Sequence, residues 1–165
     1  MKKKIILSIV FLFFLQNCGF TPIYSKNNSQ KNFSIENLDI DGDLEINNYI
    51  NSGLKRFTYS DEDKKVFNIE KKFKLKIFTD YNKNVLTKDL TGTTTDYELV
   101  LKTDIDIEFD NSREVKKYKI KFTDRFNMKK NDDKYEENSY EKLIKKDFAS
   151  SLVSKIIFHL SNEQW

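Results

Sequence analysis

Three stretches in the middle of the chain alternate apolar with charged or polar residues, and this pattern constrains the fold more than any other feature. They run from Lys72 to Ile77, from Tyr97 to Phe109 and from Val115 to Phe126. Successive side chains of a strand point to opposite faces of a sheet, so each stretch predicts a strand with one apolar face and one charged face. The turn at 110–113 predicts that the last two strands form an antiparallel pair.

One helical stripe precedes these strands and another follows them. The first consists of Ile46, Ile50, Leu54 and Phe57. Stripes with this spacing are typical of helices that pack one face against a core. The second predicts a C-terminal helix of about twenty residues and consists of Leu143, Ile144, Phe148, Leu152, Ile156 and Leu160.

The segment before the first helix predicts a strand and a turn. Phe33–Ile40 alternates with a slip at Asn37, which predicts a strand with a bulge. Asp41–Asp43 then predicts a turn whose aspartate caps the helix. A calcium loop is the alternative, but the later Gly and Glu of an EF-hand are absent.

Two segments show less regularity. We expect 81–95, with Gly92 and five threonines, to be an extended excursion with a strand at 84–90. We expect 129–138 to be a polar loop without any core residue. The order of elements predicts an α+β domain with a mostly antiparallel sheet of about four strands and two helices packed on one face.

The N-terminus has the pattern of an export leader. Lys2–Lys4 is a positive segment, and Ile5–Leu15 is an apolar stretch of 11 residues interrupted only by Ser8. A helix that spans a bilayer core needs about 20 residues, so the length excludes a transmembrane helix. We therefore expect residues 1–17 to be a signal peptide.

Cys18 directly follows this leader and is the only cysteine. Leu15, three residues before it, resembles the pattern of a bacterial lipoprotein signal, in which the cysteine becomes the acylated N-terminus. Asn17 departs from the usual Gly, Ala or Ser at its position, and whether it weakens cleavage is left open. An ordinary secretory peptide with an incidental cysteine is the alternative. Buried acyl chains such as palmitate contribute about 0.8 kcal/mol per CH₂ to membrane binding.

The rest of the chain divides into a tether and one domain. Residues 18–32 are polar after the first few positions and suit a flexible, lipid-anchored tether, and 33–165 form the predicted domain. Three of the 29 basic residues lie in 1–17, so the remaining chain carries 26 basic and 26 acidic residues. This balance argues against a nucleic-acid partner, which needs a basic excess.

Residue types that carry catalysis or bind cofactors are scarce. The chain has one Cys, one His and four Gly, which excludes a cysteine-rich metal site and leaves little for a catalytic triad or a phosphate-binding loop. His159 suits the C-terminal end of a helix. The acidic pairs Asp132/Asp133 and Glu136/Glu137 are expected in a polar loop without apolar surroundings that shift a pKa. We expect no enzyme, no cofactor and no metal.

Two lysine rows raise the question of an anionic ligand. The first is Lys72, Lys74 and Lys76, and the second is Lys117, Lys119 and Lys121. With 111–112 as the hairpin tip, Asp106 faces Lys117 and Asp104 faces Lys119, so the second row is largely neutralised across the strands. Lys102 opposite Lys121 remains a like-charge pair. A self-neutralised, solvated face is the favoured interpretation. The alternative is a site for an anionic lipid, with the residues Lys72, Lys74, Lys76, Lys102 and Lys121 as candidates.

The chain resembles LptE, the lipopolysaccharide-assembly lipoprotein family, in its alphaproteobacterial type. Cys18–Tyr24 resembles the Cys-Gly-Phe-x-Pro-[Leu/Ile]-Tyr opening of that group. The Gly-Thr-rich segment 90–94, the stretch 124–127 and the acid-rich approach to the C-terminal helix at 134–137 also resemble it in order and character. Lys and Asn replace the Arg and Ala of relatives, so Cys18 alone transfers by position.

This resemblance implies a lipoprotein of the outer membrane that faces the periplasm. It implies that Cys18 is the acylation site and that the protein binds, helps assemble and plugs the β-barrel LptD, which delivers lipopolysaccharide to the cell surface. Direct contact with lipopolysaccharide is left open, as are the residues that contact the barrel. Gly19 rather than Asp after the cysteine favours the outer membrane by analogy with enterobacterial lipoproteins. A stand-alone lipoprotein that binds an anionic lipid on its lysine rows is the alternative.

Overall fold

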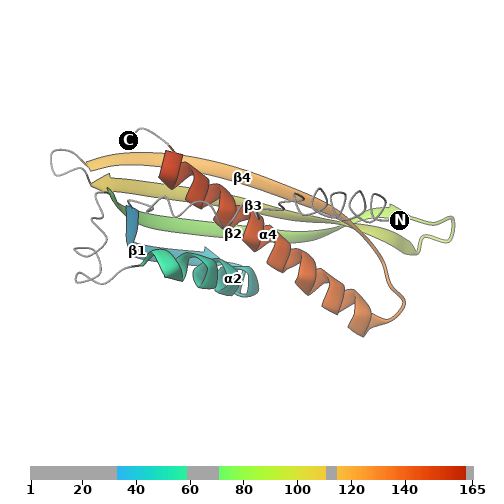
Figure 1. Ribbon diagram of the computed structural model, residues 1–165. Coiled ribbons are helices and arrows are strands. Elements are labelled where there is room, and N and C mark those ends of the chain that lie inside the picture. Colours follow the sequence, from blue (N-terminus) through green and yellow to red (C-terminus); the bar gives the residue numbers. More distant parts are fainter. Residues whose placement is uncertain (1–32, 59–70, 111–114, 163–165) are drawn as a thin grey trace, which may run out of the picture. The chain divides into compact units, whose positions relative to one another are not determined.

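Four strands in one sheet and two helices make up the part of the chain that the computed structural model describes, residues 33–58, 71–110 and 115–162 (Figure 1). All of them lie in the unit 32–165. The elements, in chain order, are β1 (Phe33–Gly42), α2 (Leu44–Leu54), the 3-10 turn η2 (Lys55–Phe57), β2 (Lys71–Lys88), β3 (Thr94–Asp110), β4 (Val115–Lys129) and α4 (Lys134–Asn162).

The sheet has the strand order β1-β2-β3-β4. β1 and β2 are parallel, whereas β2–β3 and β3–β4 are antiparallel. Parallel neighbours need a crossover connection, and α2 lies in the connection between β1 and β2. The sheet is therefore mixed and mostly antiparallel, and the predicted α+β class is confirmed.

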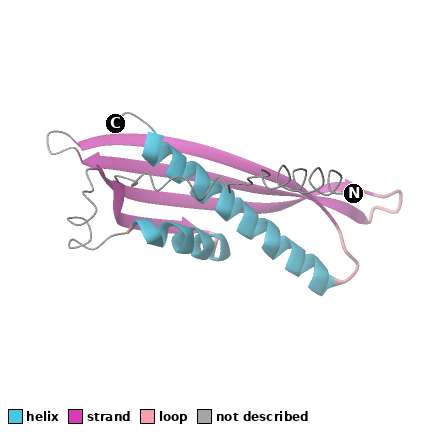
Figure 2. Cartoon of the chain, viewed as in Figure 1, coloured by secondary structure: helices cyan, strands magenta, loops and turns pink. Residues whose placement is uncertain are grey.

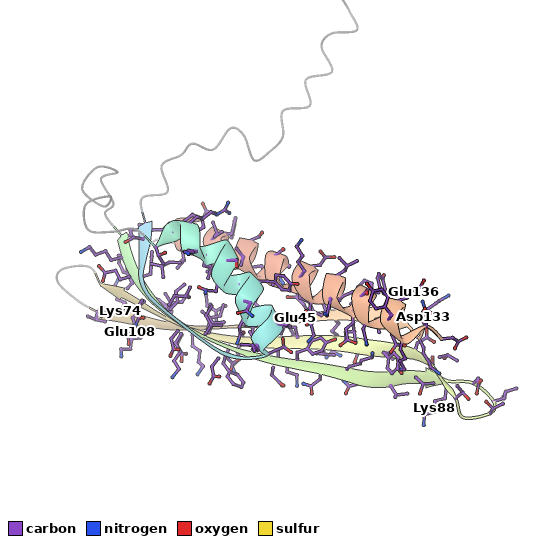
Figure 3. All side chains as sticks on the ribbon, turned by 90° about the horizontal axis from the view of Figure 1, so that it is seen from below. Glu45, Lys74, Lys88, Glu108, Asp133 and Glu136 are labelled. Atoms are coloured by element: carbon purple, nitrogen blue, oxygen red, sulfur yellow. The ribbon has the colours of Figure 1, made fainter. Side chains whose placement is uncertain are left out.

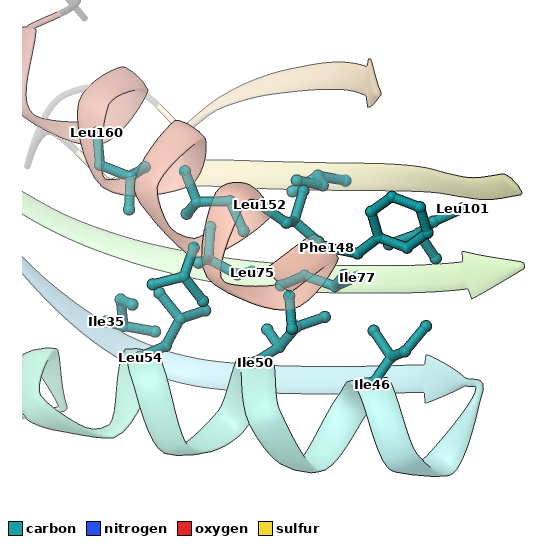
Figure 4. Packing of buried hydrophobic residues seen from close by; sticks show 14 of the residues in the cluster. Ile35, Ile46, Ile50, Leu54, Leu75, Ile77, Leu101, Phe148, Leu152 and Leu160 are labelled. Carbon is teal, nitrogen blue, oxygen red and sulfur yellow. The ribbon is translucent and has the colours of Figure 1, made fainter. Parts of the chain in front are cut away.

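Both helices cover the same face of the sheet (Figures 2 and 3). Alternate residues of β2 from Phe73 to Thr79 and of β3 from Leu99 to Phe109 are buried on this side, and Leu75, Ile77 and Leu101 point toward the helices (Figure 4). The predicted stripe of α2 is buried against this face. The predicted stripe of α4 is buried as well, except for Leu143, which is 58% exposed. A single core therefore lies between the sheet and the two helices.

The entry into α2 follows the predicted turn. The Asp43 carboxylate accepts a hydrogen bond from the Ile46 N–H at 3.0 Å and caps the helix. Gly42 has φ +110°, and a Cβ at this position would lie 1.9 Å from the Thr79 carbonyl oxygen, so no larger residue fits. The register of β1 against β2 shifts between Ile35 and Asn37, which confirms the predicted bulge.

The predicted excursion at 81–95 is a continuous hairpin. β2 runs to Lys88 and pairs with β3 as far as that residue, with register shifts between Val85 and Lys88, so the strand expected at 84–90 is present as the end of β2. β1 ends opposite Thr79, so beyond that point β3 is the only strand beside β2 in the described chain. At the tip, the Asp89 carboxylate accepts hydrogen bonds from the Thr91 and Thr93 N–H groups, and Gly92 takes φ +82°.

The predicted register of β3 against β4 is wrong by two residues. Asp106 pairs with Lys119 rather than Lys117, and Asp104 pairs with Lys121 rather than Lys119. Lys102 pairs with Thr123, so the expected like-charge pair of Lys102 and Lys121 does not form. The strands end at Asp110 and resume at Val115, which leaves four connecting residues where two were expected. A slip of two residues keeps every side chain on its predicted face.

The C-terminal helix is longer than predicted, and the loop expected at 129–138 is limited to 130–133. α4 has 29 residues and begins at Lys134. The Asp133 carboxylate caps it by accepting hydrogen bonds from the Tyr135 N–H at 2.7 Å and the Glu136 N–H at 3.3 Å. Glu137, expected to be solvated, is 3% exposed. An aspartate followed by glutamate three residues later is a helix-start signal that the polar character of the segment concealed.

Candidate functional site

The face of the sheet away from the helices carries charges that alternate in sign from strand to strand. One row across the sheet reads Asp39, Lys76, Asp106 and Lys119. The parallel row beside it reads Asn37, Lys74, Glu108 and Lys117. The acidic side chains of β3 thus lie between the two predicted lysine rows. We call this surface the charged face.

Ion pairs join β4 to β3 along the charged face. Nζ–carboxylate distances are 2.7 Å for Lys117–Glu108, 3.4 Å for Lys119–Asp106 and 2.8 Å for Lys121–Asp104. Farther along, Arg125 lies 3.0 Å from Glu98. The Lys117 ammonium, by its hydrogen bond and charge, holds the pKa of the Glu108 carboxyl below its usual value. These contacts agree with the self-neutralised face that the sequence favours.

The five lysines proposed for an anionic lipid are distributed over this face and do not form one cluster. Lys72, Lys74 and Lys76 lie on β2, where Lys72 is 3.5 Å from Glu36 and Lys74 lies next to Glu108 in register (Figure 3). Lys102 lies on β3 opposite Asp80, and Lys121 lies on β4 opposite Asp104. All five therefore have an acidic residue as ion-pair partner or directly across a strand pair, which for Lys76 is Asp106.

A partly buried polar cluster on the opposite face joins β2 to α4. The Lys83 ammonium donates to Glu137 Oε1 at 3.0 Å and to Glu141 Oε2 at 2.8 Å. The Tyr81 hydroxyl donates to the other Glu141 oxygen at 2.8 Å. The Glu137 carboxylate also accepts from the Asn131 N–H at 3.1 Å. We call these residues the Lys83 cluster.

A second set of charges joins α4 to the start of α2. The Lys145 ammonium lies 3.1 Å from Asp43 and 3.4 Å from Glu45, and it also sits 4.4 Å above the Tyr81 ring centroid. The Asp43 carboxylate that caps α2 is therefore held by the helix that packs beside it. An open hollow of about 360 Å³ lies at this junction, lined by α4 residues and Glu45.

The electrostatics of the Lys83 cluster favour the charged forms of lysine and glutamate. Burial opposes the charge on Lys83, but hydrogen bonds from it to Glu141 and Glu137 raise its pKa above the usual value. Burial likewise opposes the charge on Glu137, but Lys83 and the Asn131 N–H hold its pKa below the usual value. Burial and the hydrogen bond to Glu141 raise the pKa of Tyr81. A general acid or base needs a pKa near the working pH, and these shifts move away from neutrality.

The sequence interpretation missed this cluster because its members are far apart along the chain. Lys83 lies in a stretch expected to be irregular, and Glu137 lies in one expected to be a loop. Tyr81, Lys83 and Glu141 come together only because β2 continues past the end of β1 and α4 begins nine residues before Leu143. The helix-start signal at Asp133 was the only local indication.

The rim formed by β4 and α4 is aromatic and half-exposed. On β4, Tyr118 is 36% and Phe126 is 37% exposed, and on α4 Phe158 is 64% exposed. The Phe126 and Tyr140 ring centroids are 6.2 Å apart, and those of Phe122 and His159 are 5.8 Å apart. His159 lies in the last turn of α4, as predicted.

The described residues contain no candidate metal site and no candidate membrane-spanning helix. No group of three or more His, Cys, Asp or Glu side chains there is arranged to hold a metal ion. No helix in 33–58, 71–110 or 115–162 combines the length and the apolar character needed to cross a membrane. Cys18, with the predicted signal peptide and tether, lies outside the described residues.

Comparison with solved structures assigns the fold. No model of a protein family matches the chain, and no curated protein matches it. The solution structure of lipoprotein B from Nitrosomonas europaea matches it with a TM-score of 0.50 and 17% sequence identity, over 82% of this chain and 89% of that one. The chain has the fold of that lipoprotein B.

Two further structures are similar at lower TM-scores. A putative lipoprotein from Caulobacter crescentus has a TM-score of 0.49 and 14% identity, over 81% of this chain and 91% of that one. The rare lipoprotein B from Shewanella oneidensis has a TM-score of 0.46 and 14% identity, over 73% of this chain and 90% of that one. At 17% identity, the likeness to the Nitrosomonas lipoprotein B is one of fold, and it spans most of both chains.

Proposed function

We propose that this chain is an LptE-type lipoprotein of the outer membrane, which binds and helps assemble the LptD barrel, fills its lumen and assists the delivery of lipopolysaccharide to the cell surface. The observation that carries the proposal is the fold shared with the lipoprotein B of Nitrosomonas europaea, which spans most of both chains. The resemblance of Cys18–Tyr24 to the opening of the LptE family supports it from the sequence side.

The charged face supports a place inside a barrel lumen. Barrel interiors are polar and filled with water. A body that enters one needs a polar surface, and a surface with alternating, paired charges presents no large patch of one sign. The rows from Asp39 to Lys119 and from Asn37 to Lys117 have this character.

Membrane attachment in this proposal comes from acylated Cys18. Several acyl chains on one residue anchor a protein stably, because each buried CH₂ adds about 0.8 kcal/mol. The domain then faces the periplasm and the barrel lumen. The proposed role is structural. In the Lys83 cluster, the hydrogen bonds favour the charged forms of Lys83 and Glu137, which suits an ion pair that holds β2 and α4 together.

Detergent extraction of cells that express the full, C-terminally tagged chain tests the proposal. A large barrel protein, identified by mass, is expected to co-purify with the tagged protein, and radiolabelled palmitate is expected in the wild type but not in Cys18→Ser. Recovery of the acylated wild type as a partner-free monomer would contradict the barrel-binding role. Absence of palmitate from the wild type would contradict the anchor independently of the partner.

The anionic-lipid alternative has one observation in its favour, the exposure of the lysine side chains. That of Lys72 is 47% exposed and that of Lys121 is 68% exposed. Replacement of Lys72, Lys74 and Lys76 by Gln is the test, with vesicles rich in an anionic phospholipid as the probe. Unchanged vesicle binding by a folded triple variant rules out the β2 row as the site.

A further inference from the structure

In the described part of the chain β4 is an edge strand, and we propose that its outer edge binds an extended segment of a partner protein in which acidic and apolar residues alternate. β4 has 15 residues and pairs only with β3 within the described chain. Such an edge presents unpaired N–H and C=O groups, which form a template for one more strand. This inference goes beyond the proposed function, because the strands of a closed barrel wall have no free edge to offer.

The charged face specifies acidic residues on one side of the added strand. Charges alternate from Asp39 on β1 through Lys76 and Asp106 to Lys119 on β4. The next strand therefore meets a basic row, made of Lys117, Lys119 and Lys121. Their side chains are 72%, 59% and 68% exposed, so they retain room for a second carboxylate besides the β3 partner. Opposite charges across a strand pair are favourable.

The aromatic rim specifies apolar residues on the other side. Side chains at intervening positions of an added strand point toward the helix-covered face. There they meet Tyr118, Phe122 and Phe126 of β4, and Tyr140 and Phe158 of α4 flank the same rim. Tyr140 is 47% exposed, so these rings offer half-covered apolar surface rather than a finished core.

The same features argue against other occupants. Two copies of this chain paired through β4 would bring basic rows together, and like charges directly opposite are destabilising. The chain's own segment 18–32 contains no acidic residue and no apolar alternation after Tyr24. An acidic, amphipathic strand from a partner meets both conditions.

A synthetic peptide of about ten residues, long enough to cover Lys117–Phe126, tests the inference. In it Glu and Val alternate and both ends are blocked. Binding to the full-length protein in detergent is measured by fluorescence anisotropy, and the binding position by amide hydrogen exchange. The peptide is expected to bind and to slow exchange at alternate N–H groups of β4. A peptide with Lys in place of Glu is expected not to bind there.

Matched triple variants separate the β4 edge from general charge attraction. Replacing Lys117, Lys119 and Lys121 by Gln is expected to weaken binding about tenfold, because three cross-strand charge pairs are lost. Replacing Lys72, Lys74 and Lys76 by Gln removes the same charge from the same face and is expected to leave binding nearly unchanged. Circular dichroism checks that both variants fold.

Three outcomes overturn the inference. Equal weakening by both triple variants shows that the peptide senses overall charge rather than the edge. Slower exchange on β1 instead of β4 places the strand at the wrong edge. Slower exchange on β4 without peptide, in a protein that sediments as a dimer, assigns the edge to a second copy of the chain.

Discussion

Lys83 on β2 and Glu137 on α4 form an ion pair with 3.0 Å between Nζ and Oε1, across 54 residues of sequence. The Glu137 side chain is 2% exposed and that of Lys83 is 24% exposed, so the contact is shielded from water on the glutamate side. It fixes the beginning of α4 onto the part of β2 that extends beyond β1. The pair therefore connects two segments whose structure the sequence did not predict.

Replacement of Lys83 by Met is expected to lower the free energy of unfolding by about 3 kcal/mol, because it leaves a buried carboxylate without its main partner. Urea denaturation followed by circular dichroism measures the change. Lys88→Met, at the exposed end of the same strand, is the control and is expected to cost under about 0.5 kcal/mol. Equal effects of the two substitutions would show that the ion pair contributes nothing specific.

The stability of the protein is expected to fall in acid partly through Glu137. Burial opposes its charge, but Lys83 and the Asn131 N–H hold its folded pKa below the usual value, so the unfolded chain binds more protons in this range. The contribution is complete above the unfolded pKa of about 4.3 and is lost as pH falls through the folded pKa. Urea midpoints at a series of pH values are therefore expected to fall less steeply below about pH 5 in Glu137→Gln than in the exposed control Glu136→Gln. Parallel profiles of the two variants would contradict this.

Gly42→Ala is expected to destabilise the fold more than Gly92→Ala. Both glycines have positive φ, which costs an L-residue about 1–2 kcal/mol. At Gly42 the new Cβ also meets the Thr79 carbonyl oxygen at 1.9 Å, whereas at Gly92 nothing lies within 4 Å. The difference in melting temperature between the two variants measures the clash. If the two variants melt together, β1 has room to move away from β2 at this position.

Patterns local to one element were predictable from the sequence. The alternation around Lys74, the stripe from Ile46 to Leu54 and the cap at Asp43 each depend on neighbours within a few residues, and the structure confirms them. The bulge near Asn37 was visible for the same reason. The fold class follows from the order of such elements.

Features that depend on the length of a connection or on distant partners were not predictable. The register of β4 is set by how many residues link it to β3, and the apolar pattern is satisfied equally by a slip of two. The first turns of α4 contain polar residues that face the sheet. Glu137 and Glu141 accept hydrogen bonds there from Lys83 and Tyr81. A polar residue that is buried by a partner elsewhere in the chain looks like a loop residue in the sequence.

Leu152→Ala and Leu143→Ala are expected to differ by at least about 2 kcal/mol in stability. The two leucines belong to the same predicted stripe, yet Leu152 is 0% exposed and Leu143 is 58% exposed. Truncation of a buried leucine loses apolar burial and leaves a cavity, and the exposed one has neither effect. Chemical denaturation of the two variants measures the difference. A comparable loss for Leu143 would mean that a partner or another segment covers it.

A double-mutant cycle tests the register of β3 against β4. Asp104→Asn and Lys121→Gln are expected to show a favourable coupling of about 0.2–1 kcal/mol, the range of exposed ion pairs, because their charged groups lie 2.8 Å apart. The coupling is expected to shrink in about 1 M salt, where charges are screened within about 3 Å. The matched cycle combines Asp104→Asn with Lys119→Gln. It also removes one acidic and one basic charge, but these two residues do not lie opposite each other, so their coupling is expected to be smaller. A larger coupling for Asp104 with Lys119 would restore the register with a two-residue turn and would shift every charge pair of this face by two residues.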